Sequence, residues 1–181
     1  MKTITKTINL YELSELTDKA KEKALADWNE GNDFPIMQSH MINLLKERLD
    51  ERGIQYDADS IDVRYSLSYS QGDGFMFLGK VQWEGYYIVI KHSGHYFHSN
   101  SKDIDIYEDA NQNDHADEKV GEEFEKVYQE ICDQMERIGY DEIEYQQSME
   151  LFTETCEDNE YMFTADGTME TANTSEGIIN K

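Results

Sequence analysis

The chain has 181 residues, of which 38% are hydrophobic and 12% aromatic, and this composition excludes a fully disordered protein. Sixteen basic residues stand against 39 acidic ones, so the formal net charge is −23. Direct binding to DNA, RNA or an anionic membrane is therefore not expected, because phosphate groups would be repelled over most of the surface.

The negative charge is concentrated in the second part of the chain. Residues 1–102 hold 15 acidic and 12 basic residues, a net charge of −3, whereas residues 103–181 hold 24 acidic and 4 basic residues, a net charge of −20. This asymmetry predicts one acidic face or arm that meets a basic partner. The alternative is that the charge serves only solubility.

The first fifty residues predict one strand and two helices. Residues 3–10 alternate apolar and polar side chains and are rich in β-branched residues, which is typical of a strand. Thr17 is expected to cap a helix over residues 18–30. Apolar residues spaced at helical intervals between Met37 and Leu49 predict a second helix over residues 36–52.

The middle of the chain predicts an antiparallel meander. Apolar and polar residues alternate over 61–69, 75–83 and 86–90, with turn residues at 70–74 and 84–85. A fourth short strand is expected at Tyr96–His98 or at Ile104–Tyr107, and the sequence leaves this choice open.

The second part of the chain is mainly helical. An apolar stripe from Val120 to Ile138 predicts a helix over residues 117–138 that ends at Gly139. A further helix is expected over residues 141–157, followed by a short strand at 160–164 and a turn at 165–168. The predicted fold class is α+β, an antiparallel sheet of the meander plus the N-terminal strand packed against three to four helices. We expect a single domain over residues 1–168 and a flexible tail over 169–181.

Two motifs resemble functional sites. His92, His95 and His98 follow the pattern H-x-x-H-x-x-H, but on a strand the middle histidine faces away from the others, so a shared metal ion would need a bend at Gly94. Histidines without a metal in an aromatic stretch are the favoured interpretation. The segment Ser70–Gly74 resembles a phosphate-binding loop only superficially, because no helix and no Lys-Ser/Thr pair follow it. A hairpin turn is the better interpretation.

No feature of the sequence specifies an enzyme. Pairs such as Glu122-Glu123 and Asp141-Glu142 could be general acid and base or Mg²⁺ ligands, but carboxylates are so abundant that such pairs arise by chance. Cys132 lies in the predicted helix and is interpreted as a small buried hydrophobic residue. The sequence therefore predicts no catalytic residue, no cofactor and no metal site.

The acidic helix over residues 117–137 is the strongest candidate for function. Its carboxylates fall largely on the side away from the apolar stripe, and neighbours at i,i+3 and i,i+4 are about 5–6 Å apart. This spacing is comparable to that of phosphates along a DNA strand. The alternative is an ordinary solvated helix face. The predicted partner-binding residues are Glu118, Glu122, Glu123, Glu125, Glu130 and Asp133, together with Gln71 and Asp73 in the glycine-rich turn.

Four segments carry a resemblance to a known group of proteins. They are TINLYELSELTDKAKEKALADWNEGNDFP, SLSYSQGDGFMF, KHSGHYFH and NEYMFTADGT. With these segments the chain resembles small acidic proteins of phage and mobile-element origin, one of which, from gut bacteria, inhibits type II-A Cas9. The resemblance covers almost the whole chain except the last dozen residues, and SQGDG is its most specific part.

The resemblance implies an anti-CRISPR protein for host defence evasion. Such a protein would bind Cas9 or the Cas9–guide RNA complex and inhibit target-DNA binding or cleavage, here with its acidic surface as a DNA mimic. We expect it in the cytoplasm of a bacterial host cell, because no apolar signal segment opens the chain. We expect a monomer or a homodimer. The alternative function is an acidic antitoxin or anti-restriction protein that inhibits another nucleic-acid-binding protein.

Overall fold

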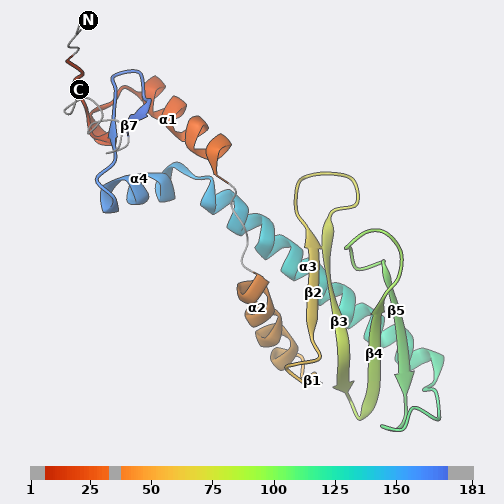
Figure 1. Ribbon diagram of the computed structural model, residues 1–181. Coiled ribbons are helices and arrows are strands. Elements are labelled where there is room, and N and C mark those ends of the chain that lie inside the picture. Colours follow the sequence, from red (N-terminus) through yellow and green to blue (C-terminus); the bar gives the residue numbers. More distant parts are fainter. Residues whose placement is uncertain (1–6, 33–37, 171–181) are drawn as a thin grey trace, which may run out of the picture. The chain divides into compact units, whose positions relative to one another are not determined.

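The computed structural model describes residues 7–32 and 38–170. The chain divides into two compact units, unit 1 from residues 1–35 and 143–181 and unit 2 from residues 36–142. The fold class is α+β, as predicted, with a five-stranded antiparallel sheet, helices and a small hairpin (Figure 1). Whether residues 1–168 behave as a single domain stays a prediction.

The helices and strands follow the predicted order closely. In chain order they are η1 (Leu13–Glu15), α1 (Asp18–Gly31), α2 (Gln38–Glu51), β1 (Gln55–Tyr56), β2 (Asp62–Ser66), β3 (Gly74–Trp83), β4 (Tyr86–His92), β5 (Lys102–Tyr107), α3 (Glu118–Gln146), α4 (Met149–Asp158), β6 (Met162–Phe163) and β7 (Met169–Glu170).

The sheet of unit 2 is the predicted meander with one further strand. β3 pairs on one side with both β1 and β2 and on the other with β4, and β4 pairs with β5, all antiparallel. The β3–β4 turn uses Glu84 and Gly85 at φ values of 49° and 91°, a geometry that matches the twist of the two strands. The fourth meander strand is therefore the second of the two predicted options, at Ile104–Tyr107.

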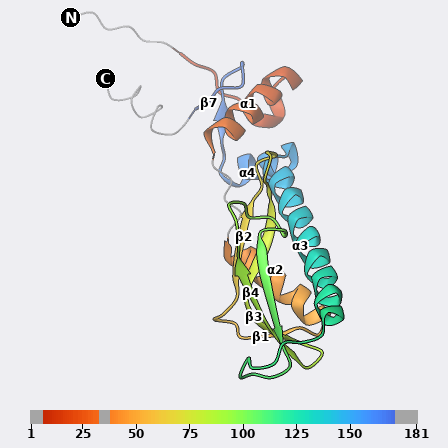
Figure 2. The ribbon, with the colours of Figure 1, turned by 90° about the vertical axis from the view of Figure 1, so that its right-hand side faces the viewer.

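Helix α3 covers one face of this sheet, as Figures 1 and 2 both show. The Tyr128 hydroxyl donates a hydrogen bond of 3.1 Å to the carbonyl of Phe77, and the two rings are 4.6 Å apart. Trp83 and Phe124 form a second ring contact at 5.5 Å. The side chains of α2 that lie at helical intervals are fully buried; they are Met41, Leu45 and Leu49. The apolar stripes read from the sequence are therefore the core of unit 2.

Gly139 does not end the long helix, contrary to the prediction. α3 continues through it to Gln146, and Gly139 itself is buried. A Cβ atom at this position would overlap the side chain of Leu67. The glycine is therefore a close-packing position inside the helix, and this cause is a tertiary contact that local sequence does not reveal.

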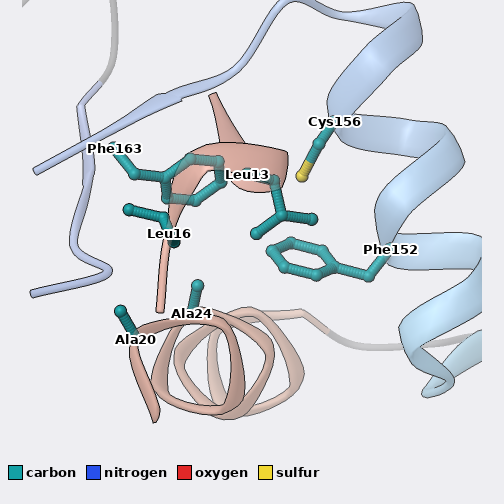
Figure 3. Close-up of a cluster of buried hydrophobic side chains, with 7 residues drawn as sticks. All are labelled: Leu13, Leu16, Ala20, Ala24, Phe152, Cys156 and Phe163. Atoms are coloured by element: carbon teal, nitrogen blue, oxygen red, sulfur yellow. The ribbon is translucent and has the colours of Figure 1, made fainter. Parts of the chain in front are cut away.

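The core of unit 1 is a separate apolar cluster (Figure 3). Its buried members are Leu13, Leu16, Ala20, Ala24, Phe152, Cys156 and Phe163. Thr17 caps α1 as predicted, since its hydroxyl accepts a hydrogen bond of 3.4 Å from the backbone of Ala20. The Trp28 ring packs on the edge of the cluster, 5.6 Å from the ring of Phe152.

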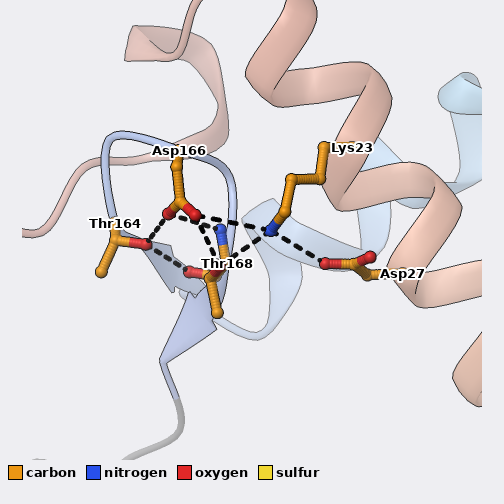
Figure 4. A network of polar contacts seen from close by, with 5 residues as sticks. All are labelled: Lys23, Asp27, Thr164, Asp166 and Thr168. Carbon is orange, nitrogen blue, oxygen red and sulfur yellow. Dashed lines mark hydrogen bonds and ion pairs between the residues drawn. The ribbon is translucent and has the colours of Figure 1, made fainter.

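The small hairpin of unit 1 is tied to α1 by polar contacts (Figure 4). Lys23 donates to the Thr168 hydroxyl at 2.8 Å and forms an ion pair of 3.1 Å with Asp27. Gly167 has a φ of 87°, and a Cβ there would overlap the carbonyl of Ala20. The turn predicted at residues 165–168 therefore requires glycine at this place.

The two ends of the described chain differ from the prediction. The N-terminal strand was expected at residues 3–10, but residues 3–6 lie outside the described part and residues 7–10 are not a strand. Tyr11 instead forms a single bridge to Phe163 in unit 1. In the expected tail, Met169 and Glu170 form β7, and residues 171–181 lie outside the described part.

Candidate functional site

The predicted acidic residues of α3 share one solvent-exposed face. We call the set Glu118, Glu122, Glu123, Glu125, Glu130 and Asp133 the acidic face, and all six are exposed. The residues on the other side of the helix are fully buried against the sheet; among them are Phe124, Tyr128, Ile131 and Met135. The structure therefore brings these six predicted site residues together on one surface.

The geometry of the acidic face follows from the length and regularity of α3. The helix has 29 residues, and at 1.5 Å per residue it is about 43 Å long. The acidic face occupies a little more than half of this length, from Glu118 to Asp133. Because an α-helix repeats every 3.6 residues, the carboxylates form an elongated band rather than a compact cluster.

Basic neighbours compensate the acidic face only in part. Glu130 pairs with Arg52 at 2.7 Å, Glu125 with Lys102 at 3.2 Å and Glu123 with Lys119 at 3.7 Å. These carboxylates are more than half exposed, so the pairs contribute little stability and can be exchanged for other cations. Within the described part of the chain, Glu118 and Glu122 form no ion pair. The band therefore remains open to a cationic partner.

The two predicted residues of the glycine-rich turn, Gln71 and Asp73, lie in different environments. The turn connects β2 to β3, as expected for a hairpin, and Gln71 is exposed in it. Asp73 is half-buried, and its carboxylate is an acceptor for its own loop. It accepts hydrogen bonds from the Ser66 hydroxyl at 2.8 Å and from the backbone of Ser68 at 2.6 Å. Further bonds come from the Ser70 backbone at 2.9 Å and the Tyr140 hydroxyl at 3.0 Å.

These hydrogen bonds set the charge state of Asp73. Burial alone would raise its pKa, but the bonds from Ser70, Ser66, Ser68 and Tyr140 together hold the pKa of Asp73 below its ordinary value. The same contact acts on Tyr140, whose pKa rises to about 12 because of burial and of the neighbouring Asp73 carboxylate. Asp73 is therefore a charged organiser of the loop, with its oxygens directed at internal donors.

Tyr140 connects the turn to α3 through its bond to Asp73, and Glu136 lies one helical turn before it. Neither was among the predicted site residues. Burial, with the charges of Asp133 and Asp73, raises the pKa of Glu136. The helical repeat places Glu136 on the same side of the helix as Glu118 and Glu122, and this spacing could have identified it from the sequence. Nothing in the sequence identifies Tyr140, because its partner Asp73 is 67 positions away.

Two of the three histidines, His92 and His98, have local partners. A ring nitrogen of His92 is 3.1 Å from the carbonyl oxygen of Tyr96, and His98 accepts from the backbone of Asn100 at 3.2 Å. His92 also packs against Phe97. Over residues 7–32 and 38–170, no group of three or more His, Cys, Asp or Glu side chains is arranged to hold a metal ion.

Cys132 is buried, as predicted, next to Tyr128 in α3. Burial raises the pKa of the Cys132 thiol to about 12, so the thiol is neutral at physiological pH. Its environment is that of a small core residue.

The comparisons with known proteins give no family for this chain. No protein-family model, no curated protein and no solved structure matches it. Among the described residues, no helix is long and apolar enough to cross a membrane.

Proposed function

We propose that this protein is an anti-CRISPR protein that binds Cas9, alone or with guide RNA, and inhibits target-DNA binding or cleavage. The observation that supports the proposal most directly is the band of six exposed carboxylates along α3. Cas9 holds the guide–target heteroduplex in a positively charged channel, and its arginines recognise the PAM, a short DNA motif next to the target sequence. An elongated acidic band has the charge to compete for such a surface.

The proposed inhibition is stoichiometric and electrostatic. The net charge of −23 would favour fast, salt-sensitive association with a cationic cleft. Glu130, Glu125 and Glu123 would exchange their basic partners for cationic groups on Cas9 at little cost, because these carboxylates are more than half exposed. The mechanism requires no turnover and no cofactor, and it operates in the bacterial cytoplasm.

The test is a Cas9 cleavage assay titrated with this protein at fixed guide and target concentrations. A variant with Glu118, Glu122, Glu123 and Asp133 changed to Lys should raise the concentration for half-inhibition by roughly tenfold or more. The control changes four exposed acidic residues of unit 1 to Lys and has the same net charge; they are Glu22, Glu30, Glu150 and Glu154. It should inhibit within roughly threefold of the wild type, because its acidic face is intact.

Order of addition separates the proposed function from its alternative. When target DNA is bound to Cas9 before this protein is added, cleavage should be inhibited less, since the inhibitor and the DNA would compete for one surface. If the wild-type protein leaves Cas9 activity unchanged, the proposal fails. Capture of a restriction nuclease or a toxin would then favour the anti-restriction or antitoxin function. Equal loss of inhibition in both variants would contradict the role of the acidic face.

A further inference from the structure

A groove lies between the outer edge of β5 and the first turns of α3. It encloses about 370 Å³. Its lining comes from Ile104–Ile106 of β5, from the segment His115–Glu118, and from Gly121, Glu122 and Glu125 of α3. The groove thus combines a strand edge, a helix surface and several carboxylates, and it lies entirely within unit 2.

The strand edge in this groove carries unpaired backbone groups. β5 is the last strand of the sheet order and pairs with β4 over its whole length. On its other side, among the described residues, the chain returns at the end of β5, where Tyr107 bridges to His115 and Ala116 donates to the carbonyl of Ile106 at 3.0 Å. The chain then turns away into α3.

The direction of the Ile106 carbonyl fixes the direction of its neighbours. Backbone groups alternate along a strand, so those of Ile104 point away from β4 in the same way as those of Ile106. Within residues 7–32 and 38–170, the N–H and C=O of Ile104 have no hydrogen-bond partner. These groups can accept a further strand.

Gly121 leaves the helix side of the groove open. A Cβ atom at this position would meet nothing within 4 Å, so the glycine is not required by packing. Glycine in a helix interior costs about 1 kcal/mol relative to alanine. Gly139 in the same helix is different, because Leu67 fills the space beside it. Gly121 therefore keeps free a space that a large side chain would occupy.

The charges around the groove select its occupant. Glu118 and Glu122 on the helix side form no ion pair in the described part of the chain, and Glu125 binds only Lys102. A second copy of this chain, with a net charge of −23, would be repelled, and so would a nucleic acid. An extended segment with basic side chains matches both the backbone edge and the carboxylates.

We propose that this groove binds an extended, lysine- or arginine-bearing segment of a partner protein, which adds to β5 as a further strand. The segment's backbone pairs with Ile104 and with the N–H of Ile106, and its basic side chains on one face reach Glu118 and Glu122. The inference goes beyond the proposed function and does not require the partner to be Cas9.

The test uses the full chain and a fluorescent nine-residue peptide of alternating lysine and valine. Titration by fluorescence anisotropy at low salt should give saturable one-to-one binding. Hydrogen exchange followed by NMR should show slower exchange of the Ile104 amide when the peptide is bound. A peptide of the same charge, with proline in place of each valine, should bind roughly tenfold more weakly, because each proline lacks an amide donor and its fixed φ disfavours a regular β-strand.

Gly121→Trp should weaken peptide binding by roughly tenfold or more, since the side chain fills the groove without changing the charge. Two controls should bind as the wild type: Gly121→Ala, which adds only a methyl group, and Gln134→Trp, which places the same ring elsewhere on α3. If Gly121→Trp does not fold, the double variant Glu118→Gln and Glu122→Gln replaces it, with the same expected loss.

Three results would overturn the inference. The first is equal affinity for the valine and proline peptides, which would reduce the interaction to charge alone. The second is unchanged binding to Gly121→Trp or to the double glutamine variant. The third is a wild-type dimer in light scattering that Gly121→Trp dissociates, which would assign the groove to a second copy. Peptide binding and Cas9 inhibition are measured separately, so either can fail without the other.

Discussion

At the scale of single residues, the carboxylate of Asp73 differs from those of the acidic face. Its oxygens accept hydrogen bonds from three serines of the loop and from Tyr140. The sequence indicated Asp73 as a contact residue because an aspartate between two glycines is typical of an exposed turn. The folded chain surrounds it with donors, so its charge organises the β2–β3 loop.

We expect Asp73→Asn to lower the free energy of unfolding by about 1–3 kcal/mol, because an amide cannot accept all these hydrogen bonds and the lost bonds were to a charged group. Urea unfolding followed by circular dichroism measures the change. Asp59→Asn is the matched control, since Asp59 is exposed, and it should have little effect. If Asp73→Asn lowers the free energy of unfolding no more than this control does, Asp73 does not organise the β2–β3 loop.

The same contacts predict how stability depends on pH. The pKa of Asp73 is lower in the folded chain than in the unfolded chain, so its charged form is stabilised by folding. Its contribution is complete above the unfolded pKa of about 4 and is lost as the pH falls through the lower folded value. The stability difference between wild type and Asp73→Asn should therefore be constant from pH 7 to 5 and shrink below pH 4.

At the scale of elements, α3 contains two glycines with opposite surroundings. Beside Gly121 there is open space, and beside Gly139 there is the side chain of Leu67. The sequence predicted Gly121 inside the amphipathic helix and Gly139 as its end, whereas both lie inside α3. Their effects on stability should differ because only one of them contacts another element.

Gly121→Ala should raise the free energy of unfolding by up to about 1 kcal/mol, the usual gain in helix propensity. Gly139→Ala should show no gain, because Leu67 must move to admit the methyl group. In a double-mutant cycle, Leu67→Ala should restore the gain at position 139. Thermal unfolding of the four variants and the wild type measures both effects. Additive changes at positions 67 and 139 would mean that the two residues do not compete for space.

At the scale of the whole molecule, the two compact units each contain one tryptophan. Trp28 packs beside the cluster of unit 1, and Trp83 is buried in unit 2 beside Phe124. The fluorescence of each can therefore report on its own unit. Such reporters also test the predicted single domain over residues 1–168.

We expect Phe152→Ala to destabilise unit 1 by about 3–5 kcal/mol, since Phe152 is fully buried and the truncation leaves a cavity. In a Trp83→Phe background, the unfolding midpoint reported by Trp28 should fall. In a Trp28→Phe background, the midpoint reported by Trp83 should change much less. Phe77→Ala is the reciprocal control in unit 2. Equal shifts of both reporters would instead favour one cooperative domain.

Features that depend on local periodicity and turn chemistry could be predicted from the order of the residues alone. The alternation over residues 75–83 specifies β3, and the apolar stripe from Val120 to Ile138 places the acidic face of α3 on the solvent side. These features follow from the repeats of two and 3.6 residues, which any stretch of chain reveals without its partners. The exposure of six predicted site residues could be foreseen for the same reason.

Features that join distant positions could not be predicted in this way and were found in the folded chain. The pairing of Asp73 with Tyr140, the contact of Gly139 with Leu67 and the return of the chain beside Ile106 each connect segments that share no local pattern. Their signals are absent from the sequence because a hydrogen bond or a steric contact depends on distance in space. Which strand edge stays open, and which carboxylate is already occupied, therefore became clear only in the folded chain.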